Sequence, residues 1–482
     1  MTVCSLPPDP LEVLSAQAFC RVADARLSHG NRVRLLRDGP QTFAAWLNAI
    51  AGARRTVHLE NYILQEDQIG RRFAEALIAA ARRGVQCQVI YDWLGCLLRT
   101  SSSFWKELRA AGVQVREYNP PRLGDPLRWI SRDHRKVLVV DGEVAFTGGL
   151  CIGHDWMGDP DKNIPPWRDT AIEIHGPAVA HIDAAFADSW ECAGSRHYTP
   201  VDTPMTNEPD PADGADGVSI SVIAGRPDVM GLYRLEQLVA EMAQRLLWLT
   251  DGYFVATAAY VRALTGAARA GVDVRLLVPG SSNWPVVGAL SKSAYRPLLQ
   301  AGVRVFEWSG PMLHAKTAVA DGVWTRIGSS NSNLASWVTN RELDVTVKDH
   351  ALAQAMERMF EEDIAQSREV VLAMGRTGIV RPVAPEPLTP PGGGPTAGRA
   401  LSGAIGLGSA LTASLSRRRR MYPEEALVAL SGAAVLLVLG MLAVLLPRVV
   451  AGIVALAAIW PGIVFLVRGI RLWREDRGSG SD

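Results

Sequence analysis

The sequence predicts an α/β protein with two tandem repeats, each a mixed sheet covered by helices, followed by a C-terminal transmembrane helical hairpin. Strand-like and helix-like segments alternate along most of the chain, which is typical of a sheet covered by helices. An internal duplication is indicated by three polar residues that recur 180 positions later (314 minus 134): His134, Lys136 and Asp141, then His314, Lys316 and Asp321. Two long uncharged segments near the C-terminus predict the hairpin.

The first repeat is expected to span 31–198, after a leader at 1–30. Its predicted strands and helices, in order, are 31–36, 42–53, 56–64, 70–83, 85–91, 103–111 and 113–118. Gly84 follows the helix at 70–83, where glycine is a typical C-cap. The strand of the motif, at 137–140, comes next in this unit.

The second repeat is expected to span 218–370, because the surroundings of the motif are repeated as well. Residues 111–113 and 301–303 both have the sequence Ala-Gly-Val. A linker at 199–217, rich in proline and acidic residues, separates the two repeats. A tether at 371–416, rich in proline and glycine, follows the second repeat.

A two-helix membrane hairpin with basic flanks is expected at 417–482. The segments Ala426–Leu446 and Val449–Val467 contain 21 and 19 residues without a charge, and a bilayer-spanning helix needs roughly 20. The alternative is a buried helical hairpin of a soluble domain. Arginines flank both ends of the pair, which predicts that both ends lie in the cytoplasm. The repeats would then face the cytoplasmic leaflet of the cell inner membrane.

The overall composition weighs against nucleic-acid binding. Lysine and arginine total 50 against 49 acidic residues, so the chain has no strong basic field that would attract a polyanion. The six cysteines form no Cys-x-x-Cys pair. We therefore expect reduced thiols, and no metal site built from them.

The repeated motif places a base beside a fixed cation. Side chains two apart on a strand point to one face, so His134 and Lys136 lie together at the exposed end of the buried strand 137–140. A single pair of this kind is more often structural than catalytic. Two copies favour one shared site, where one imidazole attacks a phosphodiester and the other protonates the leaving alcohol. The intermediate would be a phosphohistidine, and spacing does not decide which histidine forms it.

Other polar residues are candidates for the same site. The two motif lysines would neutralise the non-bridging phosphate oxygens, and Ser329 and Asn331 would donate hydrogen bonds to them. No metal is expected, because two lysines replace the cation that phosphoryl-transfer enzymes usually recruit. Asp141 and Asp321 lie at turns after the motif strands, so we expect them to support the motif rather than to carry protons.

Each imidazole also needs an acid that fixes its tautomer. Asp169 lies 35 residues after His134, and Glu342 lies 28 residues after His314. Each acid begins a predicted strand, so each could lie beside a motif strand. The alternative is a surface charge at the end of a strand.

Four further residues lie at the ends of predicted strands: Glu60, Tyr62, Asp251 and Tyr253. Their side chains either line the cleft or pack at the strand ends. The tryptophan-rich segment 154–167 has no counterpart in the second repeat. It either dips into a membrane interface, where tryptophan is favoured, or packs on the sheet as an ordinary loop.

These motifs resemble those of the phospholipase D superfamily, in which His-x-Lys is followed by four residues and an aspartate. The surrounding sequence at 60–62, 134–150 and 167–170 is similar to that of the bacterial cardiolipin synthases in this superfamily. The resemblance covers both repeats. It implies that His134 is the nucleophile and that His314 is the acid and base, and it supports an orienting acid downstream of each motif.

The sequence departs from the family pattern at one position. Asn331 lies 17 residues after His314, whereas the same distance after His134 leads to Cys151, where the family commonly has asparagine. The first half-site therefore lacks one hydrogen-bond donor. We expect Cys151 to be a buried apolar side chain rather than a nucleophile.

The resemblance implies an enzyme that moves a phosphatidyl group from phosphatidylglycerol to a second phospholipid and releases glycerol, without a cofactor. The membrane hairpin fits this activity, because both substrates lie in the bilayer. The acceptor stays open between phosphatidylglycerol, phosphatidylethanolamine and water, and transfer to water would be phospholipid hydrolysis. A nucleic-acid phosphodiesterase and an inactive membrane scaffold are the remaining alternatives.

Overall fold

The computed structural model describes Leu11 and residues 16–121, 131–194, 217–227, 229–283 and 285–372. The chain divides into two compact units, one formed by 1–118 with 131–408 and the other by 119–130 with 409–482. The helices and strands described below belong to the first unit. The expected linker, tether and membrane hairpin lie almost entirely outside the described residues. Within the described ranges, no helix is long and apolar enough to cross a membrane.

The first repeat follows helix α2 (Ala16–Ala23) and starts with strand β1 (Arg26–Arg37), which begins inside the range expected for the leader. Its other elements are α3 (Asp38–Gly52), β2 (Thr56–Asn61), α4 (Gln68–Arg82), β3 (Gln86–Asp92), α5 (Trp93–Cys96), α6 (Ser102–Ala110), β4 (Gln114–Tyr118), β5 (Lys136–Val140), β6 (Val144–Gly148), α7 (His154–Met157), β7 (Thr170–His175) and α8 (Ala178–Cys192). The predicted strands and helices are all present, with ends shifted by a few residues.

The second repeat has the same order of elements. They are β8 (Val218–Gly225), α9 (Gly231–Met242), β9 (Leu246–Asp251), α10 (Ala258–Arg269), β10 (Asp273–Pro279), α11 (Pro285–Ser293), α12 (Tyr295–Gln300), β11 (Arg304–Trp308), β12 (Lys316–Ala320), β13 (Trp324–Gly328), β14 (Glu342–Lys348), α13 (His350–Ala365) and β15 (Ser367–Val370). A single π-helical turn, η4 (Ala335–Thr339), precedes β14.

Local side-chain contacts explain two of the shifted ends. Helix α4 begins earlier than its apolar periodicity suggests, because the Asp67 carboxylate accepts the backbone N–H groups of Ile69 and Gly70 and caps it. Strand β2 ends earlier than predicted at Asn61, whose side-chain oxygen accepts the N–H of Ile63 at 3.3 Å. Polar caps of this kind override the apolar pattern at the ends of elements.

All the strands form one sheet of 15 strands, in the order β15-β11-β10-β9-β12-β13-β14-β8-β1-β7-β6-β5-β2-β3-β4. The order is mirrored about the β8–β1 pair, with β15 added at one edge. Strand β1 joins the halves because its first part pairs with β8 and its second part with β7, on either side of an irregularity between Ser28 and Asn31. The sheet is mixed, as predicted, since β2–β3–β4 and β9–β10–β11 are parallel and their neighbours antiparallel.

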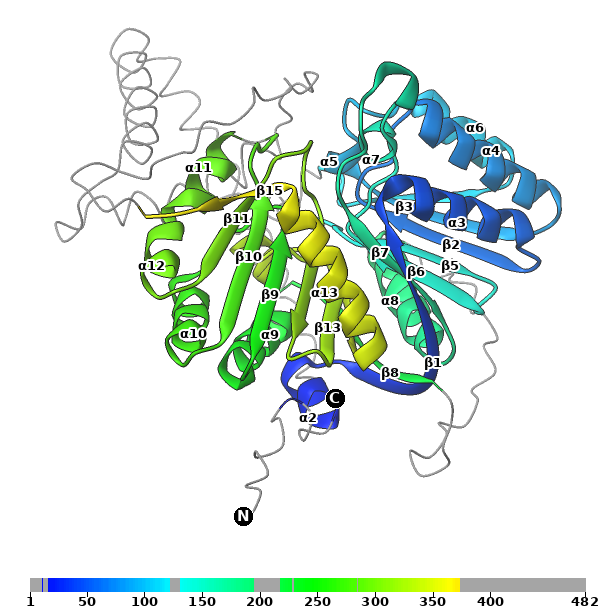
Figure 1. Cartoon of the computed structure of the whole chain (residues 1–482). Coiled ribbons are helices and arrows are strands. Elements are labelled where there is room, and N and C mark those ends of the chain that lie inside the picture. The colour runs from blue at the N-terminus through cyan, green and yellow to red at the C-terminus, as the bar shows by residue number, and fades with distance from the viewer. Residues whose placement is uncertain are drawn as a thin grey trace, which may run out of the picture. The chain divides into compact units, whose positions relative to one another are not determined.

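Three large apolar cores and a smaller cluster connect the sheet to its helices in the described part of the chain. One packs α3, α4 and α6 on the first half of the sheet, and another packs α9, α10 and α12 on the second half, as their positions in Figure 1 indicate. The third core contains Val139 and Ile182 of the first repeat together with Val319 and Met356 of the second. Because α8 and α13 both contribute to this third core, they form the apolar junction between the repeats.

The motif aspartates fix the chain at the start of a neighbouring strand. The Asp141 carboxylate accepts the backbone N–H groups of residues 54–56 at 2.8, 2.7 and 2.8 Å. Asp321 accepts those of residues 244–246 at 2.8, 2.7 and 2.9 Å. Both aspartates have a positive φ, 55° and 51°, which short polar side chains tolerate. They therefore anchor the starts of β2 and β9.

Arg135, the middle residue of the first motif, ties the two repeats together. Its side chain is fully buried. Its guanidinium donates to the carbonyls of Ala185 at 2.7 Å, Gly225 at 2.9 Å and Glu342 at 3.0 Å, and to the hydroxyl of Ser189 at 3.0 Å. Two of these acceptors belong to each repeat, so one side chain satisfies buried polar atoms on both sides of the junction.

We expect Arg135→Met to lower the free energy of unfolding by about 3–5 kcal/mol, because it leaves several buried acceptors without a donor. Urea unfolding of the variant and the parent protein measures the difference. Arg72→Met, at an exposed position of α4, is the matched control and should change stability by no more than about 0.5 kcal/mol. Equal effects of the two substitutions would contradict the role assigned to Arg135.

Candidate active site

Each motif histidine is held by a segment of the other repeat. The backbone N–H of His134 donates to the carbonyl of Arg341 at 2.9 Å, and that of His314 donates to the carbonyl of Arg168 at 2.7 Å. Isolated parallel bridges join the same segments just before β5 and β12. The two motifs are therefore brought to a common junction between the halves of the sheet.

The orienting acids are exchanged between the repeats in the same way. His134 Nδ1 lies 2.9 Å from Glu342 Oε2, and His314 Nδ1 lies 2.8 Å from Asp169 Oδ2. The sequence places an acid downstream of each motif but gives no sign that it contacts the opposite motif. The cause is that each acid directly follows the arginine whose carbonyl binds the opposite histidine. One dipeptide thus accepts both the backbone and the ring N–H of one histidine.

These contacts define the chemical state of both rings. An imidazole whose Nδ1 faces a carboxylate keeps its proton on Nδ1 and leaves the lone pair of Nε2 for reaction. Both rings are almost completely buried, with His134 9% and His314 5% exposed. The arrangement therefore supplies two oriented imidazoles, each with Nε2 as its reactive atom.

The motif lysines lie beneath aromatic rings, next to the histidines. Lys136 and Lys316 are both fully buried, and each Nζ donates to the carbonyl of the histidine two residues before it. Lys136 Nζ lies 5.3 Å from the centre of the Tyr62 ring, and Lys316 Nζ lies 5.8 Å from that of Tyr253. The same two rings contact the imidazoles edge-on, so both tyrosines lie at the site, as candidate residues of its wall.

Burial, together with the motif lysines, lowers the pKa of both imidazoles. Burial, together with Lys316, lowers the pKa of His314 to about 3. Burial also lowers the pKa of His134, and although Glu342 opposes this, both lysines add to it. Each imidazole therefore feels the lysine of the other repeat, which requires the half-sites to be close. Burial lowers the pKa of Lys316 itself to about 8.

The two orienting acids are anionic at neutral pH. Burial alone would raise the pKa of Asp169 and Glu342, but the imidazole partners and the lysines outweigh it and leave both pKa values lowered. The site thus places imidazoles of lowered pKa between buried anions and buried cations. A phosphodiester anion would add the negative charge that raises an imidazole pKa.

The two acids have different surroundings. Asp169 accepts three hydrogen bonds: its Oδ1 accepts the N–H of Thr170 at 2.8 Å, and its Oδ2 accepts the ring N–H of Trp156 at 3.0 Å besides that of His314. Trp156 is 2% exposed and packs edge-on against His314. Trp156 therefore packs against one imidazole, whereas residues 160–165 of the same segment are exposed.

Ser329 and Asn331 have unequal positions. The Ser329 hydroxyl donates to Glu342 Oε2 at 2.5 Å and accepts the N–H of Leu343 at 2.9 Å. Its one proton is therefore used on the orienting acid, which differs from the expected phosphate contact. Asn331 is 5% exposed, and its side-chain oxygen has no hydrogen-bond partner among the described residues. Asn331 stays a candidate phosphate ligand.

The expected cleft acids are part of the packed interior. Glu60 is fully buried, and burial raises its pKa well above the usual value. Asp251 accepts the backbone N–H of Tyr253 at 2.8 Å and of Ser332 at 2.6 Å, which fixes two loops. Cys151 is 1% exposed within the first apolar core, and burial raises the pKa of its thiol. It packs as an apolar side chain.

Sequence reasoning missed the two arginines that precede the orienting acids. The carbonyls of Arg168 and Arg341 hold the histidines, while the Arg168 side chain is fixed by Asp363 at 2.8 Å and Asp38 at 3.2 Å. A signal was present, because residues 168–169 and 341–342 both have an arginine followed by an acid. Comparison of the two repeats would have aligned these dipeptides.

The chain matches the family model described as "Cardiolipin synthase, PLD-like domain" over residues 46–188 and 239–364, more than half of its 482 residues. It belongs to this family. The matched segments contain both His-x-Lys motifs and both orienting acids. Family membership therefore agrees with the resemblance seen in the sequence.

This PLD-like protein is similar to named proteins over much of its length. A cardiolipin synthase of Geobacillus thermodenitrificans (strain NG80-2) is 35% identical over 330 residues, 67% of this chain and 64% of that protein. Cardiolipin synthase A of Pseudomonas entomophila (strain L48) is 33% identical over 350 residues, 70% of each chain. The crystal structure of phosphatidylserine synthase from Haemophilus influenzae Rd KW20 has a TM-score of 0.54 at 13% identity and covers 73% of this chain and 91% of that one, so it shares the fold.

Stability is expected to fall as the pH drops below about 6.5, in part because of His314. Its pKa is about 3 when folded and about 6.5 when unfolded, so in between only the unfolded chain binds the proton. The contribution of His314 to the free energy of unfolding is complete above the pKa of the unfolded chain. It is lost as the pH falls toward the pKa of the folded chain, with a slope of at most about 1.4 kcal/mol per pH unit. The free energy of urea unfolding, measured against pH, should change less steeply in His314→Gln. An unchanged slope would contradict the lowered pKa.

Proposed function

We propose that this PLD-like protein is a phosphatidyltransferase of the cardiolipin synthase type, which moves a phosphatidyl group from phosphatidylglycerol to a second phospholipid and releases glycerol. The crossed contacts of His134 with Glu342 and of His314 with Asp169 carry the proposal. They orient two Nε2 atoms at one buried site that also holds two lysines. A two-step displacement at phosphorus needs these groups.

In the first step His134 Nε2 attacks the phosphorus of phosphatidylglycerol. The N–P bond forms while the P–O bond to the glycerol headgroup breaks. His314 gives its proton to the departing glycerol oxygen. It can carry this proton because the phosphodiester anion offsets the field of the two lysines and raises the imidazole pKa in the complex.

In the second step the acceptor phospholipid enters through a hydroxyl group. His314 takes the hydroxyl proton, the oxygen attacks phosphorus, and the N–P bond to His134 breaks. The proton on Nδ1 of His134 stays on the ring throughout and is donated in a hydrogen bond to the Glu342 carboxylate. This hydrogen bond stabilises the phosphohistidine. Protons and charges thus return to their starting positions after each cycle.

The lysines supply the positive charge that phosphoryl transfer needs. Lys136 and Lys316 are buried, and their charges act in a medium of low dielectric constant, where each preorganised charge counts for several kcal/mol. We therefore propose that the reaction needs no metal or cofactor. Asn331 would complete the phosphate site with its side-chain N–H groups.

The membrane supplies the substrates in this proposal. We propose that 417–482 form a two-helix hairpin that anchors the protein in the inner membrane, with the catalytic repeats on the cytoplasmic side. The charge-free segments and flanking arginines support it.

Phospholipid hydrolysis is the second candidate, because water could replace the acceptor hydroxyl at the same intermediate. A nucleic-acid phosphodiesterase is disfavoured by the balanced charge.

Purified full-length protein in vesicles of phosphatidylglycerol should form cardiolipin and glycerol in equal amounts. Addition of phosphatidylethanolamine tests whether a second acceptor is used, and EDTA should leave the rate unchanged. His134→Ala should lower the rate by about 10⁴-fold or more, because it removes the covalent route. Phosphatidic acid as the only product would overturn the transferase assignment in favour of hydrolysis. Loss of activity with EDTA would contradict the metal-free mechanism.

The covalent intermediate should form on His134. Incubation with ³²P-labelled phosphatidylglycerol, an alkaline quench and peptide mapping by mass spectrometry identify the modified ring. We expect an adduct on the peptide that contains His134 and none in His134→Asn, which is the matched control. An adduct on His314 would reverse the roles of the two histidines.

A further inference from the structure

Three large apolar side chains are exposed at one edge of the sheet. Leu98, Ile164 and Leu334 are 88%, 40% and 45% exposed. Leu98 follows β3, Ile164 lies between β6 and β7, and Leu334 lies between β13 and β14. The other two exposed ones in the described part of the chain, Val371 and Leu372, end the described range after β15. Single exposed apolar residues are normal on a protein surface, but three at one edge call for an explanation.

This edge of the sheet is the one that carries the active site. Strand register pairs Asn61, the last residue of β2, with Lys136, and Asp251, the last residue of β9, with Lys316. Strand β3 runs parallel to β2, while β6 and β13 run antiparallel to the motif strands β5 and β12. All three strands therefore end on the motif side, where α5 and α7 also lie in Figure 1. Apart from the two residues that end the described range, the opposite edge exposes no large apolar side chain within that range.

The segment after β2 joins the first two of the loops that carry these side chains. The N–H of Glu66 donates to the carbonyl of Arg99 at 3.0 Å, next to Leu98. The N–H of Gln65 donates to the carbonyl of Ile152 at 2.9 Å, in the connection between β6 and β7. These two loops are therefore neighbours in space.

The surroundings of His314 join the second loop to the third. The ring centre of Trp167, at the end of the β6–β7 connection, lies 6.0 Å from that of His314. The Tyr253 ring lies 5.7 Å from the same imidazole, and the Tyr253 carbonyl accepts the side-chain N–H of Asn333 at 3.1 Å. Because Asn333 directly precedes Leu334, the three loops form a connected set around the catalytic imidazole.

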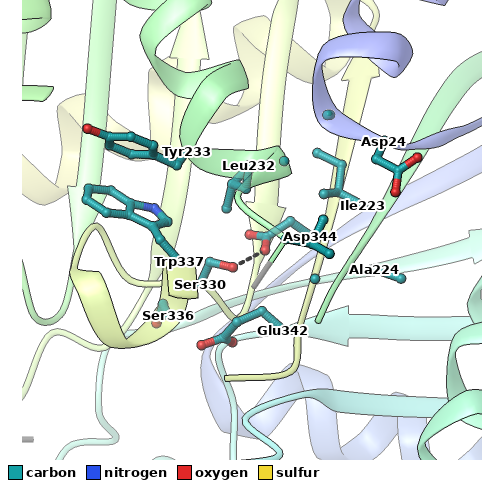
Figure 2. Close-up of a pocket in the computed structure, with 14 residues that line it drawn as sticks. Asp24, Ile223, Ala224, Leu232, Tyr233, Ser330, Ser336, Trp337, Glu342 and Asp344 are labelled. Atoms are coloured by element: carbon teal, nitrogen blue, oxygen red, sulfur yellow. Dashed lines mark hydrogen bonds between the residues drawn. The ribbon is translucent and has the colours of Figure 1, made fainter. Parts of the chain in front are cut away.

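Ordered turns present two of the apolar side chains. The N–H of Ile164 donates to the carbonyl of Asp159 at 2.9 Å, and the Ile164 carbonyl accepts the N–H of Asp159 at 2.7 Å. Leu334 precedes η4, in which Trp337 is buried with its ring centre 4.6 Å from that of Tyr233 (Figure 2). Packing and backbone hydrogen bonds thus hold these turns while their apolar tips stay exposed.

Leu98 has a backbone conformation that is unusual for its side chain. Its φ is 61°, in the left-handed region. The other six described non-glycine residues with a positive φ are all aspartate or asparagine, whose short polar side chains tolerate this region. A leucine gains no such local hydrogen bond, and at 88% exposure it gains little packing. Backbone outliers of this kind are found mainly where function requires them.

The loops around these side chains are poor in charge. Three segments at this edge contain no charged residue: 253–257, 280–283 and 329–340. In the β6–β7 connection, the exposed Lys162 is paired with Asp159 at 2.7 Å. A polyanion would instead require a basic surface. Apolar tips on a nearly uncharged surface fit the boundary between the headgroups and the acyl chains of a lipid layer.

We propose that Leu98, Ile164 and Leu334 form an apolar rim that inserts into the surface of a phospholipid bilayer and holds the active site against its substrates. The inference rests on the proposed function, in which the acyl chains of phosphatidylglycerol stay in the bilayer while its phosphate reaches the imidazoles. Apolar side chains gain free energy when they leave water for the acyl boundary. The rim orients the site, a role separate from the anchoring proposed for 417–482.

Fluorescence quenching in vesicles tests the rim without turnover. A cysteine is introduced by Leu98→Cys, Ile164→Cys or Leu334→Cys, one at a time, in the full-length protein and is labelled with a fluorophore. Serine first replaces Cys4 and the exposed Cys192. The other native cysteines are buried: Cys20, Cys87, Cys96 and Cys151. In vesicles of phosphatidylglycerol and phosphatidylethanolamine, a phospholipid with a nitroxide on its acyl chain should quench each label about twofold or more.

Glu143→Cys is the matched control, because Glu143 is exposed in the turn between β5 and β6, at the opposite edge. Its label should stay unquenched. Absence of quenching at the rim would overturn the proposal, since water, another protein or another part of the chain would then cover these side chains. This readout needs no reaction, so failure of the rim is distinguishable from failure of the proposed function.

Two physical forms of the substrate test the role of the rim in catalysis. The combined variant Leu98→Asn, Ile164→Ser and Leu334→Ser should lower kcat/KM for phosphatidylglycerol in vesicles by about tenfold or more, because three apolar contacts with the lipid are lost. With short-chain phosphatidylglycerol dissolved as monomers, the rate of glycerol release should stay within about twofold of the parent. Leu98→Asn alone should not lower the urea midpoint, because asparagine tolerates the positive φ. Equal losses with both forms of the substrate would overturn the role of the rim.

Discussion

The whole site depends on hydrogen bonds that cross between the repeats. His134 is oriented by Glu342 and His314 by Asp169, so a single repeat would contain an imidazole without its acid and an acid without its imidazole. The features that join the halves therefore matter for catalysis as much as for folding. They are the pairing of β1 with β8, the apolar core shared by α8 and α13, and the buried guanidinium of Arg135.

Joining the halves also concentrates buried charge. Lys136, Lys316, Glu342 and Asp169 are each at most 2% exposed, and an unpaired ion in such a position costs several kcal/mol. The charges balance, and the two imidazoles between them stay neutral because burial and the lysines lower the pKa of both rings. A bound phosphate anion shifts this balance in favour of imidazole protonation. In the proposed mechanism, the acid needed for the reaction is therefore formed when the substrate binds.

The sequence predicted the repeats, the mixed sheet and the residues of both motifs, because period-two alternation and a constant offset of 180 positions are visible in one dimension. It did not predict which acid serves which histidine. Spacing along the chain favours an acid of the same repeat, and the exchange arises only when the two half-sheets pack together. Nor did it predict that the Ser329 hydroxyl donates to Glu342. A serine near a phosphate site could equally well donate its proton to the phosphate. Side-chain partners in a buried site are decided by packing, which spacing does not encode.

The sequences of the two repeats have diverged, so the two imidazoles have unequal surroundings, which a symmetric site would not provide. A two-step displacement needs one imidazole that attacks and another that exchanges a proton, whereas a perfect duplication would offer two equal rings. Here Asp169 is enclosed by Trp156 and backbone, while Glu342 lies beside two serines, a second acid and a small cavity. The ring on the polar side, His134, would become cationic if it were phosphorylated, and the buried Glu342 anion beside it would stabilise that charge. The asymmetry of the surroundings therefore gives the two duplicated imidazoles different electrostatic environments, which unequal roles in a two-step displacement require.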